Sequence, residues 1–214
     1  MALLDTISDN FDDNSVGAIW TNNYGGAVET NQRARTPCSS GNYAGYQTSK
    51  IYTLAGSSIF VELVTVPAAS TATDMNFAMG ILSATDGTNL QFNISPVTGN
   101  MRFESNVAYF DAGATSVTFS AVTHRWLRFR ETGGTLFWDT STDGTNWTNR
   151  RSLTTPAWVT SGTDALGFEV FAYRDAGVAD NGEFDNMNIA PAVNTVVAKS
   201  YINNQQAIRR TSLW

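Results

Sequence analysis

Alternation of apolar and polar side chains with a period of two most constrains what this chain can fold into. Across 166–173, Leu166, Phe168, Val170 and Ala172 fall on one face of an extended backbone. A period of two belongs to β-strands, whose successive side chains point to opposite faces. The same kind of strand pattern occurs in four other stretches of the chain: 58–66, 75–82, 125–131 and 135–141.

Short turn sequences separate these stretches. Four pairs mark them: Asp86-Gly87, Gly99-Asn100, Gly133-Gly134 and Asp143-Gly144. Such pairs supply the positive φ angles that tight hairpins require. Before residue 192 no window holds an apolar stripe at helical spacing over three turns. The pattern predicts one all-β domain over residues 1–191, a two-sheet antiparallel β-sandwich, followed by a C-terminal arm.

Composition excludes several classes of function. The net charge of −6 disfavours nucleic acid as a partner, because phosphate binding needs clustered Lys and Arg. No apolar run approaches the roughly 20 residues of a membrane-spanning helix, so no membrane partner is expected. The N-terminus has neither a basic start nor an apolar block, which indicates synthesis in a cytoplasm without a signal peptide. Ordinary cytosolic proteins share this feature.

Residues 192–214 differ from the rest. They contain Lys199, Arg209 and Arg210 and no acidic residue, whereas the preceding 191 residues carry a charge of −9. A large apolar residue such as Trp214 gains most from a partner's pocket. We therefore expect this arm to dock on another protein, with a frayed tail as the alternative. The candidate docking residues are Tyr201, Ile208, Arg209, Arg210, Leu213 and Trp214.

Three segments together resemble the concanavalin A-like (laminin-G-like) jelly-roll family. The opening segment 9–15, Asp-Asn-Phe-Asp-Asp-Asn-Ser, precedes Trp20 and is similar to the family's first strand. The run from Trp126 to Trp147, with its Gly-Gly turn and Ser-Thr-Asp-Gly sequence, looks like its paired later strands, and 182–187 like its closing strand. Domains of this appearance resemble minor tail and other virion surface proteins of phages that infect actinobacteria.

The resemblance implies a location in a virion and a structural role. Tail or tail-tip placement is favoured over capsid decoration, with other virion proteins as partners through 192–214 and a homo-oligomer expected. Adhesion to a host cell-wall glycan is a further implied role. A free carbohydrate-binding, lectin-like module is the alternative, and it would not need residues 192–214. Fold by itself does not fix which of these roles applies.

Glycoside hydrolysis requires a pair of carboxylates, and the chain carries part of a motif that supplies them. β-Jelly-roll glucanases of the laminarinase type carry Glu-x-Asp-x-(x)-Glu on one strand, and Glu183 and Asp185 match its beginning. Met187 or Asn188 then stands where the second glutamate is needed, and neither can donate the proton. His124 is the only histidine, which leaves little room for a histidine-based triad or metal cluster. The sequence therefore predicts no enzymatic activity and no catalytic residue.

Calcium and glycans are the two classes of ligand that the sequence can accommodate. No cofactor is predicted, with calcium as the alternative, held by Asp9, Asp12, Asp13 and Asp185 if the first and last strands are neighbours. Sugars stack on exposed aromatic rings while polar side chains bind their hydroxyl groups. Loop or edge aromatics that can serve are Trp20, Tyr24, Tyr43, Tyr46, Tyr109, Trp158 and Tyr173. The candidate glycan site comprises Tyr173, Arg174, Asp175, Trp158 and Tyr109, although core packing is the alternative for each aromatic.

Overall fold

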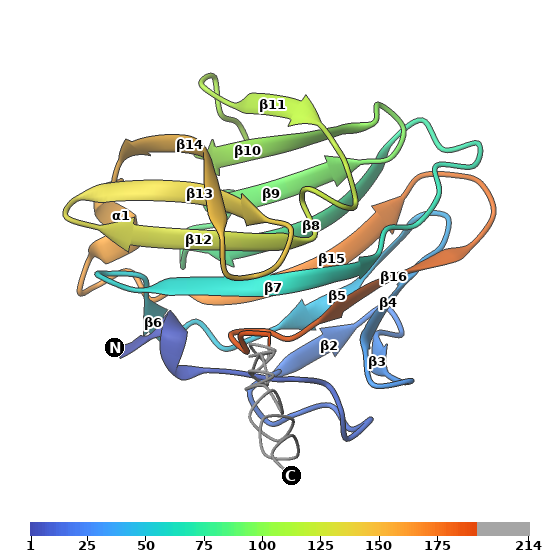
Figure 1. Ribbon diagram of the computed structural model, residues 1–214, viewed down its shortest axis with the longest axis horizontal. Helices are drawn as coiled ribbons and strands as arrows, with labels where there is room; N and C mark the ends of the chain where they lie inside the picture. The colour runs from blue at the N-terminus through green and yellow to red at the C-terminus, as the bar shows by residue number, and fades with distance from the viewer. Residues whose placement is uncertain (192–214) are drawn as a thin grey trace, which may run out of the picture.

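The computed structural model describes residues 1–191, which form two stacked antiparallel β-sheets (Figure 1). The five-stranded sheet has the order β11-β10-β9-β8-β15. Its strands are β8 (Met75–Leu82), β9 (Asn89–Ser95), β10 (Asn100–Asn106), β11 (Thr115–Thr118) and β15 (Gly167–Arg174). The seven-stranded sheet has the order β14-β13-β12-β7-β16-β4-β3. Its strands are β3 (Val28–Glu29), β4 (Ala34–Cys38), β7 (Ser58–Thr65), β12 (Trp126–Thr132), β13 (Thr135–Ser141), β14 (Trp147–Thr154) and β16 (Asp180–Asp185).

Two short strand pairs complete the sheets. The pair β2 (Asn22–Tyr24) and β5 (Asn42–Gln47) extends the five-stranded sheet beyond β15. Hydrogen bonds at both ends of β5 join it to β15: Gly41 N to Arg174 O at 2.8 Å and Thr48 N to Phe168 O at 3.0 Å. The parallel pair β1 (Ala2–Leu3) and β6 (Tyr52–Thr53) lies near the N-terminus. Within residues 1–191, helix is confined to a 3₁₀ turn at Leu4–Thr6 and to α1 at Ala157–Thr160.

The prediction of an all-β jelly-roll sandwich is confirmed. Strands β8 and β13 have the predicted bounds, β7 ends one residue earlier than predicted, and β12 and β15 are each shifted by one residue toward the C-terminus. Non-sequential neighbours such as β8 with β15 and β7 with β16 mark the crossovers between the sheets. None of the helices in residues 1–191 is long and apolar enough to cross a membrane.

The core lies between the two sheets. Phe168, Val170 and Ala172 of β15 are buried as their alternation predicted, with exposed fractions of 0–1%. Aromatic rings from the two sheets contact each other across the core. Phe92 of β9 lies 4.8 Å from Phe129 of β12, measured between ring centroids. Burial of this apolar area is the main stabilising contribution to the fold.

Glycines occupy the turns where backbone geometry demands them. Gly87, Gly99 and Gly144 have φ angles of about +70°. Residues other than glycine are disfavoured in this left-handed region, because their Cβ atom comes too close to the backbone. The turn pairs that were read from the sequence therefore end strands where predicted.

Candidate glycan-binding cleft

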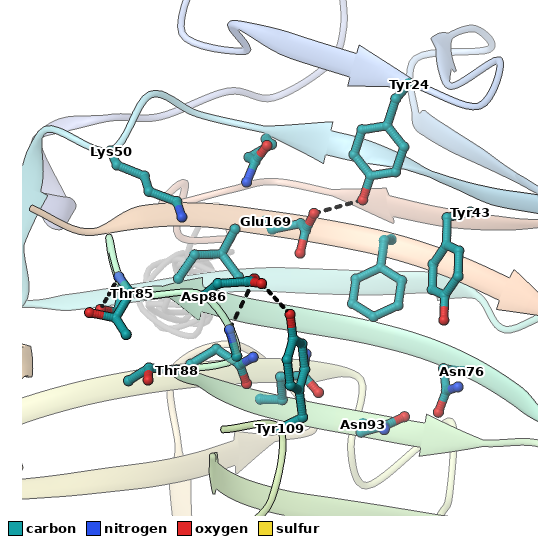
Figure 2. A pocket seen from close by; sticks show the side chains of 17 residues that line it. Tyr24, Tyr43, Lys50, Asn76, Thr85, Asp86, Thr88, Asn93, Tyr109 and Glu169 are labelled. Carbon is teal, nitrogen blue, oxygen red and sulfur yellow. Dashed lines mark hydrogen bonds between the residues drawn. The ribbon is translucent and has the colours of Figure 1, made fainter. Parts of the chain in front are cut away.

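A cleft of about 400 Å³ lies on the outer face of the five-stranded sheet, on the side opposite the core. It crosses the strands from β2 and β5, over β15, β8 and β9, to the turn after β10 (Figure 2). We call this feature the cleft throughout. Its lining includes Tyr24, Tyr43, Lys50, Asp86, Gln91, Asn93, Tyr109, Glu169 and Phe171.

Strand alternation explains why the floor of the cleft is polar. On β9, Leu90, Phe92 and Ile94 enter the core, so that Gln91 and Asn93 face outward into the cleft. The amide oxygen of Asn93 is buried and has no hydrogen-bond partner among residues 1–191. Buried polar atoms without partners are rare in native proteins. Asn93 itself lines the cleft, so a buried polar atom without a partner lies at the cleft floor.

Aromatic rings form one end of the cleft. Tyr43 of β5 stacks on Tyr173 of β15, with ring centroids 4.1 Å apart and an interplanar angle of 19°. The Phe171 ring lies 6.1 Å from that of Tyr43. Tyr43 is 55% exposed, so one part of its ring is open to solvent. An exposed ring beside amide groups is a combination that suits the apolar face of a sugar.

Glu169 lies at the centre of the cleft and is hydrogen-bonded to Tyr24 on the β2 side of the cleft. The Tyr24 hydroxyl of β2 donates a hydrogen bond to Glu169 Oε1 of β15 at 2.6 Å. Burial raises the pKa of Glu169, while the Tyr24 hydrogen bond and the charge of Lys50 oppose that shift. Burial, with the nearby charge of Glu169, also raises the pKa of the Tyr24 phenol well above its usual value.

Asp86 forms a second carboxylate–tyrosine pair. It lies in the β8–β9 turn, and its carboxylate accepts hydrogen bonds from the Tyr109 hydroxyl and from Gly87 N. The Tyr109 backbone N–H also donates to Gly87 O at 2.8 Å. A Cβ on Gly87 would come within 2.8 Å of the Tyr109 ring, so glycine is needed for the ring to lie there. This ring, 70% exposed, forms the other end of the cleft.

The turn that carries Tyr109 is strained. Ala108 and Tyr109 have φ angles of 52° and 65°, a conformation in which side chains other than glycine are uncommon. Val107 and Phe110 exchange backbone hydrogen bonds on either side of these two residues. Strain of this kind clusters at functional sites, where the surrounding structure maintains it.

The structure separates the five predicted glycan-binding residues. Tyr109 lines the cleft, and Tyr173 lies beside it under Tyr43. Arg174 is fully buried and donates to the carbonyls of Ala68 and Val178, so it is unavailable to a ligand. Asp175 binds Thr73 and the nearby backbone, outside the cleft, and Trp158 packs against the core. Strand alternation explains the burial of Arg174, because Tyr173 faces outward and the next residue on β15 therefore faces inward.

Two of the aromatics that were read as loop or edge residues belong to the core. Trp20 is 5% exposed and Tyr46 is fully buried, and their ring centroids are 5.4 Å apart. The Trp20 indole N–H donates to Asp9 Oδ2 at 2.8 Å. The interpretation of these two rings as glycan platforms is therefore corrected.

The four acids of the candidate calcium site are used in local hydrogen bonds. Asp9 binds Trp20 and the backbone of Phe11, Asp12 accepts from Asn10, and Asp13 accepts from Ser15 N. Asp185 forms an ion pair with Arg33 at 2.5 Å. The segments around Asp9 and Met187 do approach each other, through an isolated antiparallel bridge, although β1 pairs with β6 and β16 pairs with β4 and β7. Within residues 1–191, however, no group of three or more His, Cys, Asp or Glu side chains could hold a metal ion.

Glu183 and Asp185, the partial glucanase motif, lie on β16 of the seven-stranded sheet and thus outside the cleft. Glu183 forms an ion pair with Arg35 at 2.8 Å and accepts a hydrogen bond from Thr65. His124 is 4% exposed and accepts from Ser120 N through Nδ1, and burial lowers its pKa to about 4. Glu183, Asp185 and His124 do not line the cleft.

Sequence reasoning missed Glu169, Asp86, Lys50 and the amides of β9. A usable signal was present in 89–94, where Asn and Gln alternate with Leu, Phe and Ile. Alternation of that kind identifies an outward polar row, although it does not say which outward face is hollow. The predicted docking residues Tyr201, Ile208, Arg209, Arg210, Leu213 and Trp214 lie outside the described residues.

Comparisons with known proteins show which solved structures share this fold. No protein-family profile and no curated protein sequence matches the chain. Among solved structures, the chain is similar to the catalytic domain of an endo-1,3-β-glucanase (laminarinase) from Thermotoga petrophila RKU-1, with 10% identity and a TM-score of 0.63 over 85% of this chain and 94% of that one. A laminarinase from Flavobacterium sp. UMI-01 gives 7% identity and a TM-score of 0.60, over 85% and 96% of the two chains.

A β-glucanase from Bacillus licheniformis is also similar, with 12% identity and a TM-score of 0.57 over 85% of this chain and 95% of that one. The fold is thus the jelly-roll sandwich of these β-glucanases, in agreement with the predicted concanavalin A-like class. The prediction of no enzymatic activity is contradicted, because the similar structures are glycoside hydrolases. That prediction rested on the missing second glutamate of a motif on β16, a strand that does not line the cleft.

Proposed function

We propose that the protein binds a glycan in the cleft. The observation that carries this proposal is the combination of outward amides on β9 with aromatic rings at both ends of one cavity. The amides of Gln91 and Asn93 can bind hydroxyl groups, and the rings of Tyr43 and Tyr109 can stack on sugar faces. The similar solved structures, which are named as glucanases, support a carbohydrate ligand.

Binding is tested by titrating the protein with soluble polysaccharides and oligosaccharides in a calorimeter. Tyr43→Ala and Gln91→Ala are expected to weaken binding at least tenfold, since each removes a direct contact. Thr148→Ala, an exposed change on β14 of the other sheet, is the matched control and should bind like wild type. The proposal fails if no glycan binds, or if the cleft variants bind as tightly as the control.

Glycoside hydrolysis in the same cleft is a second candidate. Its supporting observation is that the cleft holds two carboxylates in different environments. Glu169 is partly buried with a raised pKa, which suits a general acid, and the exposed Asp86 suits a nucleophile or base. Release of reducing ends from a bound glycan, lost in both Glu169→Gln and Asp86→Asn, is expected. Binding without release of reducing ends from any bound glycan excludes this candidate.

Display on a virion is proposed separately. Its support is the sequence resemblance to phage surface proteins and the contrast between the basic segment 192–214 and the acidic residues 1–191. On this proposal the segment attaches the domain, as a homo-oligomer, to other virion proteins. Removal of residues 192–214 should then abolish incorporation into particles while leaving a folded domain. Incorporation that survives the truncation would exclude an anchoring role.

A further inference from the structure

Four acidic side chains on the seven-stranded sheet have arginine partners. On the seven-stranded sheet, Asp139 lies 2.8 Å from Arg128 and Glu62 forms an ion pair with Arg125. Glu183 and Asp185 likewise have arginine partners. These pairs compensate the cost of removing each carboxylate from water. These four carboxylates are therefore electrostatically compensated by arginines of the protein itself.

The two carboxylates of the cleft have no such partner. Among residues 1–191, neither Asp86 nor Glu169 has a basic group within the 4.0 Å of an ion pair. Their hydrogen-bond donors are neutral: the Tyr24 phenol for Glu169, and the Tyr109 phenol with Gly87 N for Asp86. Lys50 is the one cation that lines the cleft in the described part of the chain. With both carboxylates ionised, the cleft therefore carries a net negative charge.

The geometry of the cleft gathers these groups at one place. Figure 2 shows Tyr24 and Tyr109 directed from opposite sides toward Glu169 and Asp86. Aromatic faces attract cations through the negative charge above the ring. Carboxylates with neutral donors and nearby phenol rings together form a setting that a cation stabilises better than a neutral or anionic group.

We propose that the preferred ligand is a glycan with free amino groups, whose ammonium binds between Asp86 and Glu169. The inference rests on the proposed glycan-binding function and narrows it to a class of sugar. A free glucosamine-type unit supplies the ammonium, while the remaining hydroxyl groups bind the amides of Gln91 and Asn93. Acetylated amines, hydroxyl groups and uronic acids lack the positive charge.

The experiment compares β-1,4-linked hexasaccharides that differ only at carbon 2 of each sugar. Titration calorimetry at pH 6 and moderate salt measures the free-amine, N-acetylated and hydroxyl forms against the full-length protein. The free-amine form is expected to bind at least tenfold more tightly than the other two. Glu169→Gln and Asp86→Asn should each remove most of this preference, measured as the ratio of the affinities for the free-amine and hydroxyl forms.

Glu183→Gln is the matched control, because it removes one negative charge from the opposite sheet without changing the cleft. It should retain the preference, whereas general attraction of a polycation to an acidic protein would fall equally in all three variants. Equal or tighter binding of the N-acetylated or hydroxyl form overturns the amino-sugar inference and leaves glycan binding intact. Absence of binding by all three forms overturns the inference, and the wider polysaccharide titration then decides glycan binding separately.

Discussion

The Tyr24 hydroxyl lies 2.6 Å from Glu169 Oε1 and joins β2, near the N-terminus, to β15. These residues are separated by 145 positions in the sequence. The hydrogen bond closes one wall of the cleft and satisfies a carboxylate that burial would otherwise penalise. Stability and the proposed function therefore depend on the same contact.

Replacement of Tyr24 by Phe tests this contact. The variant leaves Glu169 Oε1 without its phenol donor, and we expect a loss of about 1–3 kcal/mol in the free energy of unfolding near neutral pH. The pKa of Glu169 should rise further, because the Tyr24 hydrogen bond lowers it. Urea denaturation measures the first effect and carbon-13 NMR titration the second. Tyr43→Phe, at an exposed tyrosine, should change stability by less than about 0.5 kcal/mol. Equal losses of unfolding free energy in Tyr24→Phe and Tyr43→Phe would contradict the stabilising role of the Tyr24–Glu169 hydrogen bond.

Gly45 allows β5 to approach β15 closely. A Cβ at this position would meet Val170 O at 2.4 Å and the Tyr24 hydroxyl at 2.9 Å. Gly45→Ala should therefore push the strands apart, with a loss of roughly 1–3 kcal/mol. Gly162→Ala, where nothing lies within 4 Å and φ is not positive, serves as the control and should be close to neutral. Thermal denaturation compares the two variants, and a neutral Gly45→Ala would show that the strands do not pack as described.

Glu29 is expected to make stability depend on pH. Its side chain is 7% exposed, and burial with the nearby charge of Asp9 raises its pKa from 4.5 to about 7. Because the folded state holds the proton more tightly, the contribution of Glu29 is fully present below about pH 4.5 and is lost as pH rises to about 7. The whole change corresponds to about 3 kcal/mol.

Glu29→Gln removes the titrating group and keeps its shape. The variant should exceed wild type in the free energy of unfolding at pH 8 by more than it does at pH 4.5, as measured by urea denaturation at both values. A difference between the two proteins that is the same at both pH values would contradict the raised pKa.

A substitution in the strained turn after β10 is expected to increase the free energy of unfolding. Ala108 has a φ of 52°, so Ala108→Gly should relieve strain and increase the free energy of unfolding by roughly 0.5–1 kcal/mol. Ala121→Gly, at an exposed turn position whose φ is not positive, should decrease it by a similar amount. Differential scanning calorimetry measures both. A lower melting temperature for Ala108→Gly would show that the turn is not strained.

Period-two alternation predicted the sheets well because it depends on local geometry. Side chains such as Phe168 and Met79 are buried whichever strands lie beside their own. The sequence of one strand is therefore enough to predict which of its side chains face the core. The cleft was harder to predict, since Tyr24, Asp86, Tyr109 and Glu169 come from four separate segments. Their proximity follows from the order of strands in the sheet, which alternation does not specify. Arg174 follows the alternation of β15, but its partners, the carbonyls of Ala68 and Val178, come from loops whose positions alternation does not specify.

Mapping a bound glycan onto individual residues tests the central claim most directly. Amide chemical shifts of the isotopically labelled protein would be followed by NMR during titration with a glycan that binds. We predict shifts concentrated on β5, β8, β9 and β15 and on the turn that carries Tyr109, together with the side-chain amides of Gln91 and Asn93. Shifts confined to β12, β13 and β14 of the seven-stranded sheet would contradict the claim that the cleft is the binding site.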